Sequence, residues 1–95
     1  MAKSHDRAAR LIANRYGGTY DPTRSPDVRS PQRNIEVKST TSEIPTGLGQ
    51  LRWSRKPTYI ALPAAEHPDA LQKLEGTGVG LMNHNGDIVK KARRS

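Results

Sequence analysis

The stretch SPDVRSPQRNIEVKST, residues 25–40, constrains the fold more than any other part of this chain. The aliphatic residues Val28, Ile35 and Val37 alternate with polar ones, as in strands that bury one face. Pro31 lies between the two halves, at a position that type I turns favour. The stretch therefore predicts a β-hairpin, and a four-residue loop suits type I geometry better than a two-residue loop.

The centre of the turn also decides which residues lie opposite each other. A turn centred between Pro31 and Gln32 pairs residues whose numbers sum to 63, which sets Asp27 opposite Glu36. Both acids then lie with Lys38 on the sheet face opposite the aliphatic residues. Like charges directly opposite, with Cβ atoms roughly 4.5–5.5 Å apart, destabilise a sheet, so the pair requires a compensating cation.

Two acids and a lysine in this pattern suit an oxygen-ligated metal ion. Mg²⁺ prefers hard oxygen ligands, commonly one or two carboxylates with waters and a substrate phosphate. The ion would polarise the phosphate, and the Lys38 ammonium would stabilise the developing negative charge, which fits phosphodiester hydrolysis. The alternative is an exposed sheet face on which Glu36, Lys38 and Arg29 form weak ion pairs.

The charge of the chain favours a polyanionic partner. There are 16 Lys and Arg residues against 9 Asp and Glu, a net charge of +7 that fits nucleic acid, although a solvated basic surface would look the same. The absence of cysteine excludes disulfides and thiolate metal sites. No apolar run has the length of a signal sequence or membrane span, so we expect a cytoplasmic protein without a membrane partner.

The N-terminal segment predicts an amphipathic helix over residues 4–16. Ser4 is the expected N-cap, Asp6 suits the first turn, and Gly17-Gly18 should end the helix. The residues that recur at three- and four-residue spacing and should face the core are Ala8, Leu11, Ile12 and Tyr16.

The remaining segments complete a small α/β domain over residues 1–95, with residues 91–95 as a basic tail. The histidines His5, His67 and His84 lack the spacing of metal ligands and are expected at the surface. A last hairpin should turn at Asn85-Gly86. The other expected elements are strands at 19–20 and 57–63, a helix over 47–55, and a helix from Pro68 to Gly76 with Ala70, Leu71 and Leu74 inward.

The pair Pro26-Asp27, followed by IEVK at residues 35–38, resembles the signature of the PD-(D/E)xK nuclease superfamily. That family includes restriction enzymes, archaeal Holliday-junction resolvases and virus-type replication-repair nucleases. The elements expected over residues 4–62 follow the order of its core. The resemblance implies a restriction-endonuclease-like fold: a small mixed β-sheet flanked by helices, α-β-β-β-α-β plus a C-terminal helix and hairpin. It also implies a Mg²⁺- or Mn²⁺-dependent homodimer that cleaves DNA, branched DNA by analogy with resolvases.

The resemblance also implies roles for single residues. Asp6 would support the site from the first helix, where the resolvase-like branch usually has a glutamate. Helix-dipole stabilisation explains Asp6 equally well, and a helix-surface position explains Gln50. The residues that the resemblance assigns to catalysis are Asp27, Glu36, Lys38 and Gln50, and those assigned to the metal are Asp27, Glu36 and the Val37 carbonyl.

Six basic residues lie near the acids in sequence or on adjoining elements. We expect them to contact DNA phosphates, which gives a salt-dependent affinity with little base specificity. The alternative function is a small basic nucleic-acid-binding protein with a non-catalytic nuclease-like fold, and a structural or partner-binding subunit comes third. The six residues expected to contact DNA are Arg24, Arg29, Arg33, Arg52, Arg55 and Lys56.

Overall fold

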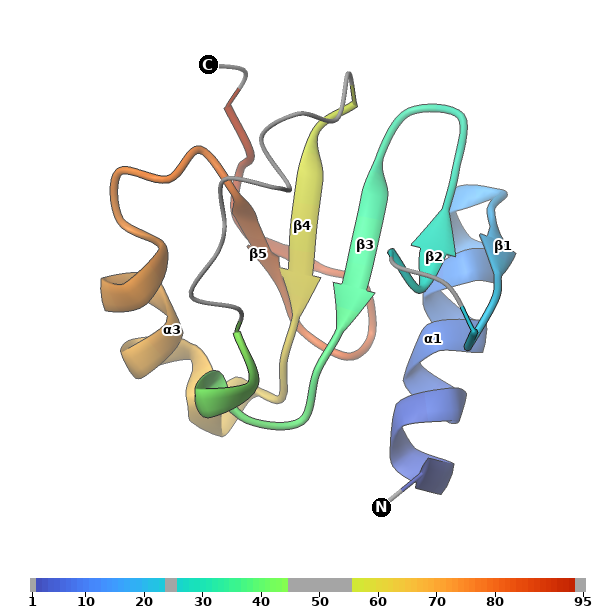
Figure 1. The fold of residues 1–95 in the computed structure, drawn as a ribbon, viewed down its shortest axis with the longest axis horizontal. Helices are drawn as coiled ribbons and strands as arrows, with labels where there is room; N and C mark the ends of the chain where they lie inside the picture. Colours follow the sequence, from blue (N-terminus) through green and yellow to red (C-terminus); the bar gives the residue numbers. More distant parts are fainter. Residues whose placement is uncertain (1, 24–25, 45–55, 94–95) are drawn as a thin grey trace.

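The computed structural model describes residues 2–23, 26–44 and 56–93 of the chain. These residues form a six-stranded sheet in which the strands lie side by side in chain order, with helices α1 and α3 packed against it (Figure 1). The elements are α1 (Ala2–Tyr16), β1 (Thr19–Tyr20), β2 (Val28–Arg29), β3 (Asn34–Val37), the 3₁₀ turn η1 (Thr41–Glu43), β4 (Thr58–Ala61), the 3₁₀ turn η2 (Ala64–Glu66), α3 (His67–Leu74), β5 (Gly80–Met82) and β6 (Ile88–Lys90).

The sheet is mixed, as expected for a small α/β domain. Strands β1, β2 and β3 are antiparallel, β3, β4 and β5 are parallel, and β6 returns antiparallel to β5. Parallel neighbours need a crossover connection, and between β4 and β5 this connection contains η2 and α3. The helix expected over residues 47–55 lies outside the described residues.

The register predicted for the hairpin is confirmed. Val28 pairs with Ile35 and Arg29 pairs with Asn34. Four residues, 30–33, separate the two strands, as type I geometry favours. The Ser30 N–H donates to the Arg33 carbonyl at 2.9 Å, and the Ser30 hydroxyl oxygen accepts the Arg33 N–H at 3.1 Å. A side chain thus supplies one of the bonds that close the loop.

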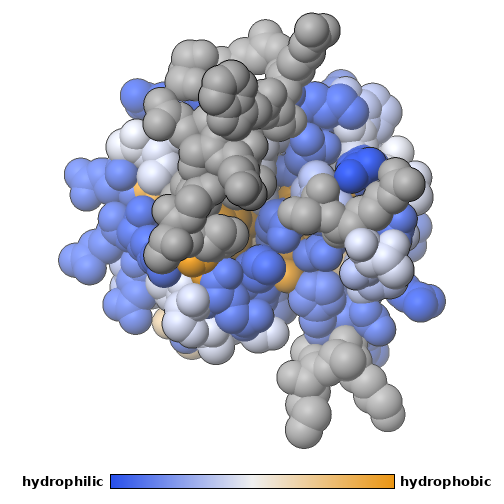
Figure 2. All heavy atoms as spheres, viewed as in Figure 1, coloured by the Kyte–Doolittle hydropathy of each residue, from blue (hydrophilic) through white to orange (hydrophobic). Residues whose placement is uncertain are grey.

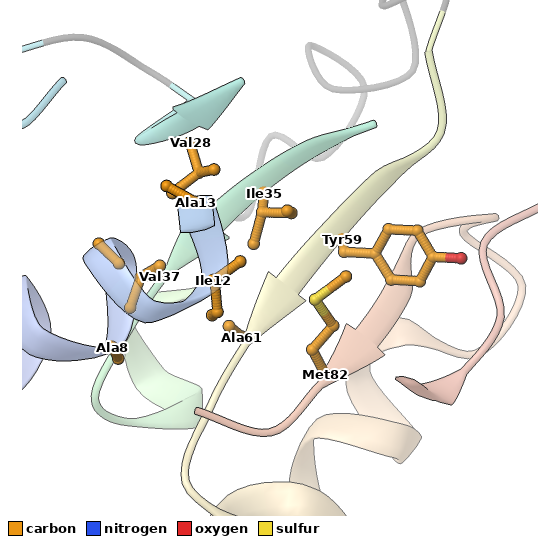
Figure 3. Close-up of a cluster of buried hydrophobic side chains, with 10 residues drawn as sticks. Ala8, Ile12, Ala13, Val28, Ile35, Val37, Tyr59, Ala61 and Met82 are labelled. Atoms are coloured by element: carbon orange, nitrogen blue, oxygen red, sulfur yellow. The ribbon is translucent and has the colours of Figure 1, made fainter. Parts of the chain in front are cut away.

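Each face of the sheet carries its own hydrophobic core, because successive strand residues point to opposite faces. The cluster under α1 joins small helix residues to the aliphatic face of the hairpin (Figure 3). It includes Ala8, Ala9, Ile12, Ala13, Val28, Ile35, Val37, Tyr59, Ala61 and Met82. The cluster under α3, on the other face, consists of Ile44, Ile60, Leu62, Ala70, Leu74, Val79 and Leu81.

The start of α1 differs from the expectation. The helix begins at Ala2, so Ser4 lies inside it and is not its N-cap. Asp6 correspondingly lies beyond the first turn, which contains no acidic residue. The reason is that Ala2 and Lys3 are good helix formers, so nothing stops the helix from extending towards the N-terminus.

The buried face of α1 is also narrower than expected. Leu11 is 43% exposed, while Ala9 and Ala13 are buried. Small side chains let the helix lie close to the sheet, so the alanines occupy the contact that hydrophobicity alone would assign to Leu11. The end of the helix agrees with the prediction: Gly17 has a φ of +64°, and the Gly18 N–H donates to the Ala13 carbonyl at 2.8 Å.

The C-terminal half follows the predicted order with one error in burial. Ala70 and Leu74 form the buried side of α3, as expected. Leu71 is 39% exposed, because it lies on the outer side of this helix, which buries a single stripe of residues. The hairpin at Asn85-Gly86 is confirmed, with a φ of +87° at Gly86.

On the face shown in Figure 2 the described side chains are mainly hydrophilic, and hydrophobic residues appear between them, chiefly near the middle of the view. Within residues 2–23, 26–44 and 56–93, neither helix is both long enough and apolar enough to cross a membrane.

Candidate functional site

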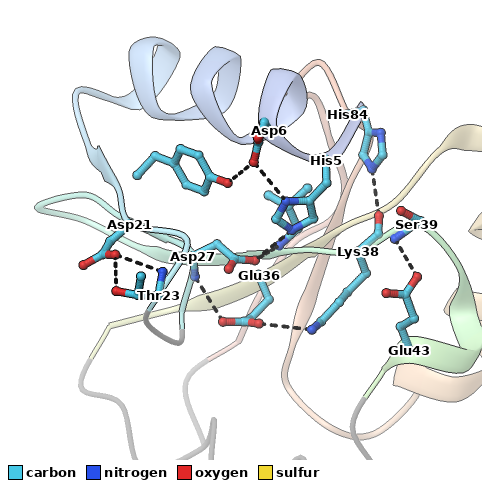
Figure 4. A network of polar contacts seen from close by, with 12 residues as sticks. His5, Asp6, Asp21, Thr23, Asp27, Glu36, Lys38, Ser39, Glu43 and His84 are labelled. Carbon is cyan, nitrogen blue, oxygen red and sulfur yellow. Dashed lines mark hydrogen bonds and ion pairs between the residues drawn. The ribbon is translucent and has the colours of Figure 1, made fainter. Parts of the chain in front are cut away.

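The three residues that carry the predicted chemistry meet beside the β2–β3 hairpin (Figure 4). The Lys38 ammonium lies 3.5 Å from Glu36 Oε2. The side chains are 13% exposed for Asp27, 7% for Glu36 and 25% for Lys38. Carboxylates that are so little exposed need hydrogen-bond donors or cations around them. The structure supplies both.

The two acids are held by a reciprocal pair of hydrogen bonds. The Asp27 N–H donates to Glu36 Oε1 at 3.1 Å, and the Val37 N–H donates to Asp27 Oδ2 at 3.0 Å. Each carboxylate therefore binds main chain from the opposite side of the hairpin. The main-chain pairing of β2 with β3 stops at Val28, and these side-chain hydrogen bonds continue the contact between the two segments beyond it. The two acids therefore meet just beyond the paired residues.

Lys38 is fixed at the carboxyl end of β3 by two main-chain bonds. Its N–H donates to the Ala61 carbonyl at 2.9 Å, which extends the parallel pairing with β4. Its carbonyl lies 2.8 Å from His84 Nε2, and because a carbonyl can only accept, Nε2 must carry a proton. His84 was expected at the surface without a role. The structure instead places it, partly buried, against the main chain of the lysine.

The turn that carries His84 is itself held by the end of α1. The Tyr16 hydroxyl donates to the Gly86 carbonyl, and the Arg15 guanidinium donates to the Asn85 carbonyl at 3.0 Å. Arg15 also pairs with Asp87 at 2.6 Å, and this hydrogen bond lowers the pKa of Asp87 below its ordinary value. The β5–β6 turn is therefore tied to both α1 and β3.

A second chain of contacts reaches the acids from α1. His5 Nε2 lies 3.3 Å from Asp27 Oδ2, and His5 Nδ1 lies 3.9 Å from Asp6 Oδ1. The Tyr20 hydroxyl donates to Asp6, and this bond, with burial, raises the pKa of Tyr20 to about 12. Asp6 therefore reaches Asp27 through His5, whereas the resemblance implied that Asp6 supports the site directly. Sequence reasoning missed His5, whose only signal was its position next to Asp6.

The basic residues expected to bind DNA are differently placed. Arg33 lies over the rings of Tyr16, at 4.4 Å, and Tyr59, at 5.7 Å, which is cation–π packing. Lys56 donates to the Ser30 carbonyl at 3.0 Å. Both side chains therefore help to hold the hairpin loop. Arg29 is exposed on β2, and the predicted site residues outside the described part of the chain are Arg24, Gln50, Arg52 and Arg55.

The described donor set fits magnesium better than zinc. No group of three His, Asp or Glu side chains in the described part of the chain is arranged to hold a metal ion. Zinc usually takes three or four side-chain ligands, whereas Mg²⁺ is held by one or two carboxylates and completes its shell with water and phosphate. Asp27 and Glu36 offer two carboxylates, and the expected third oxygen, the Val37 carbonyl, belongs to the residue after Glu36.

Comparisons of this chain with protein-family models, with curated proteins and with solved structures found no match. The chemistry of the acidic site is therefore the main guide to what the protein does.

Proposed function

We propose that this protein is a metal-dependent endonuclease that hydrolyses DNA phosphodiester bonds. The observation that carries the proposal is the nearly buried pair of carboxylates, Asp27 and Glu36, with the Lys38 ammonium 3.5 Å from Glu36. The group lies at the carboxyl end of β3, beside the parallel strand β4. Open α/β sheets commonly bind ligands outside the carboxyl ends of their parallel strands.

The described topology supports a restriction-endonuclease-like fold as part of the proposal. Helix α1 precedes the antiparallel strands β1, β2 and β3, and β4 then lies parallel to β3. This is the order of the PD-(D/E)xK core that the motif at Asp27, Glu36 and Lys38 resembles. The sheet also extends beyond that core through β5 and β6.

Each residue of the site has a distinct part in the proposed reaction. Asp27, Glu36 and the Val37 carbonyl bind Mg²⁺ or Mn²⁺, which when bound supplies Lewis-acid stabilisation of the phosphate charge. The Lys38 ammonium stabilises the negative charge that develops on the phosphate or orients the attacking water. His5 holds the Asp27 carboxylate in place, and Gln50 assists Lys38 as the resemblance implies.

The proposed substrate is DNA, and the proposed assembly is a homodimer. The net charge of +7 favours a polyanion. Branched DNA follows by analogy with the resolvases, whose twofold symmetry presents one active site to each of two strands.

A small nucleic-acid-binding protein without catalysis is the second candidate. The hydrogen bonds from Asp27 N–H and Val37 N–H, together with Lys38, already satisfy much of the carboxylate pair. In that case the acids would stabilise the hairpin, and the basic surface would do the binding. Loss of both acids would then leave DNA affinity intact, with no reaction to lose.

The deciding experiment is a nicking assay on supercoiled, linear and four-way-junction DNA with Mg²⁺, Mn²⁺ or EDTA. Wild-type protein should cleave only with a divalent ion. Glu36→Gln keeps an acceptor for the Asp27 N–H but removes the charge, and it should abolish cleavage. Lys38→Ala should slow cleavage on the order of 10²-fold with little change in DNA affinity.

Glu75→Gln and Lys91→Ala are the matched controls, because both residues are exposed and lie outside the site. They should cleave at the wild-type rate. Equal metal-dependent cleavage by Glu36→Gln and Glu75→Gln would remove Glu36 from the mechanism. DNA binding without metal-dependent cleavage would favour the second candidate.

A further inference from the structure

A groove lies between α1 and the outer edge strand β1, next to the acidic site. Its volume is about 550 Å³, within the range of sites that hold one small molecule. Asp6, Arg10 and Asn14 recur every four residues, so they form one stripe along the helix. The residues of the lining that bear on its chemistry are Asp6, Arg10, Asn14, Thr19, Tyr20 and Pro22.

The groove is continuous with the acids through a chain of contacts. Asp6 lines the groove and accepts a hydrogen bond from Tyr20, which lines its other wall. Asp6 also lies 3.9 Å from His5, and His5 lies 3.3 Å from Asp27. The His5 and Asp6 side chains therefore link the groove to the acidic site.

Asp6 and Tyr20 are bonded to each other, but two other polar side chains of the groove, Arg10 and Asn14, are uncommitted among the described residues. Arg15 is paired with Asp87, and Arg33 is stacked on Tyr16. Arg10, by contrast, is exposed and has no hydrogen bond or ion pair among the described residues. In the same part of the chain, the Asn14 amide also has no partner. A free guanidinium beside a free amide is a combination that suits a nucleotide: phosphate for the first, base or sugar for the second.

We propose that this groove binds one unpaired nucleotide of the DNA strand, next to the phosphate that the acidic site cleaves. Arg10 contacts the adjoining phosphate, and Asn14 and Thr19 hydrogen-bond the base or sugar. The inference rests on the proposed function for its cleavage step, but the binding itself does not. It names the substrate class as DNA with an unpaired segment beside the cleavage point.

The dimensions agree with this placement. Arg10 follows Asp6 by one helical turn, about 6 Å along the axis at 1.5 Å per residue. Stacked nucleotides in one strand rise about 3.4 Å each, so Arg10 lies one to two nucleotides from Asp6. A groove of about 550 Å³ has room for one nucleotide and not for a duplex.

The test is an NMR titration of the protein with tetrathymidylate in EDTA, where no cleavage can occur. The amide signals of Arg10, Asn14 and Thr19 should shift together. Arg10→Gln should weaken binding about tenfold, because a hydrogen bond to a charged group contributes about 1.5 kcal/mol or more. It should also flatten the dependence of log affinity on log salt by about 0.7.

Lys73→Gln is the matched control. It also removes one positive charge, from an exposed residue of α3, the helix that covers the other face of the sheet. It should leave both quantities near the wild-type values. The proposal is overturned if the groove signals stay unmoved, or if Arg10→Gln and Lys73→Gln weaken binding equally. Groove binding by a wild-type protein that cleaves no DNA would refute the nuclease and leave the nucleotide site standing.

Discussion

Replacing Asp27 by asparagine is expected to stabilise the protein in the absence of divalent ions, whereas replacing it by alanine is expected to destabilise it. The two variants differ in whether residue 27 can still accept a hydrogen bond from the main chain. Asparagine keeps an oxygen that can accept the Val37 N–H, which now bonds Asp27 Oδ2 at 3.0 Å, and alanine does not. Both substitutions remove the repulsion between Asp27 and Glu36.

The magnitudes follow from the contacts. Two unit charges roughly 5 Å apart, the general Cβ spacing of residues directly opposite in a hairpin, repel by about 3 kcal/mol at an effective dielectric constant of about 20. The Lys38 ammonium, 3.5 Å from Glu36, offsets most of this. Asp27→Asn should therefore gain about 1 kcal/mol. Asp27→Ala leaves the buried Val37 N–H without its acceptor at a cost of about 1–3 kcal/mol, so it should lose about 1 kcal/mol overall.

The assay is urea denaturation at neutral pH in EDTA, with Glu75→Gln as a surface control that should stay within about 0.5 kcal/mol of wild type. An Asp27→Ala variant as stable as Asp27→Asn would refute the argument from the Val37 hydrogen bond. Equal losses in both variants would show that the acids do not repel each other in the folded protein. Added Mn²⁺ should stabilise wild type and neither Asp27 variant, because only wild type keeps both carboxylates.

Two further predictions concern the contacts around the site. His84→Ala should lower the rate of DNA cleavage about tenfold with unchanged KM, because the Lys38 carbonyl loses its bond; His67→Ala, which removes a similar bond elsewhere, should cleave normally. The pKa of Tyr20, about 12 against an ordinary 10, means that its bond to Asp6 stabilises the protein fully below pH 10 and less as the pH rises towards 12. Asp6→Asn should return this pKa towards 10 in a ring-carbon NMR titration, and an unchanged value would contradict the assigned contact.

The hairpin and its acids were predictable from the sequence because their determinants are local. Alternation places Val28, Ile35 and Val37 on one face, and a turn next to Pro31 fixes the register, so the position of Glu36 follows by counting. Such patterns involve residues within about ten positions of each other. The observed structure differs from this prediction only beyond Val28, where hydrogen bonds of the Asp27 and Glu36 side chains replace the main-chain pairing of the strands.

Contacts between distant segments could not be predicted in the same way. Nothing in the local sequence of His84 indicates that its ring meets the Lys38 carbonyl, and nothing near His5 points to Asp27. Charge alone also could not show that Arg33 packs over tyrosine rings while Arg10 stays open to solvent. In each case the answer depends on how the sheet brings separate elements together.

Burial in α1 shows a further limit of pattern reading. Hydrophobic periodicity ranks Leu11 above Ala9 and Ala13, yet Leu11 is exposed and the two alanines are buried. Periodicity measures which residues are apolar, but packing also depends on how closely a helix approaches the sheet. A helix that lies close to its neighbour selects small residues for the contact.

The contacts between the end of α1 and the β5–β6 turn have a consequence for folding during translation. Arg15 meets Asp87 across 72 residues, Tyr16 meets Gly86 across 70, and His84 meets Lys38 across 46. Contacts of such long range form late, because the intervening chain must first be ordered. During translation the acids and the lysine leave the ribosome well before the segment that braces them. A nascent chain therefore carries Asp27, Glu36 and Lys38 before their supporting contacts exist, and the final geometry forms only once β6 has been made.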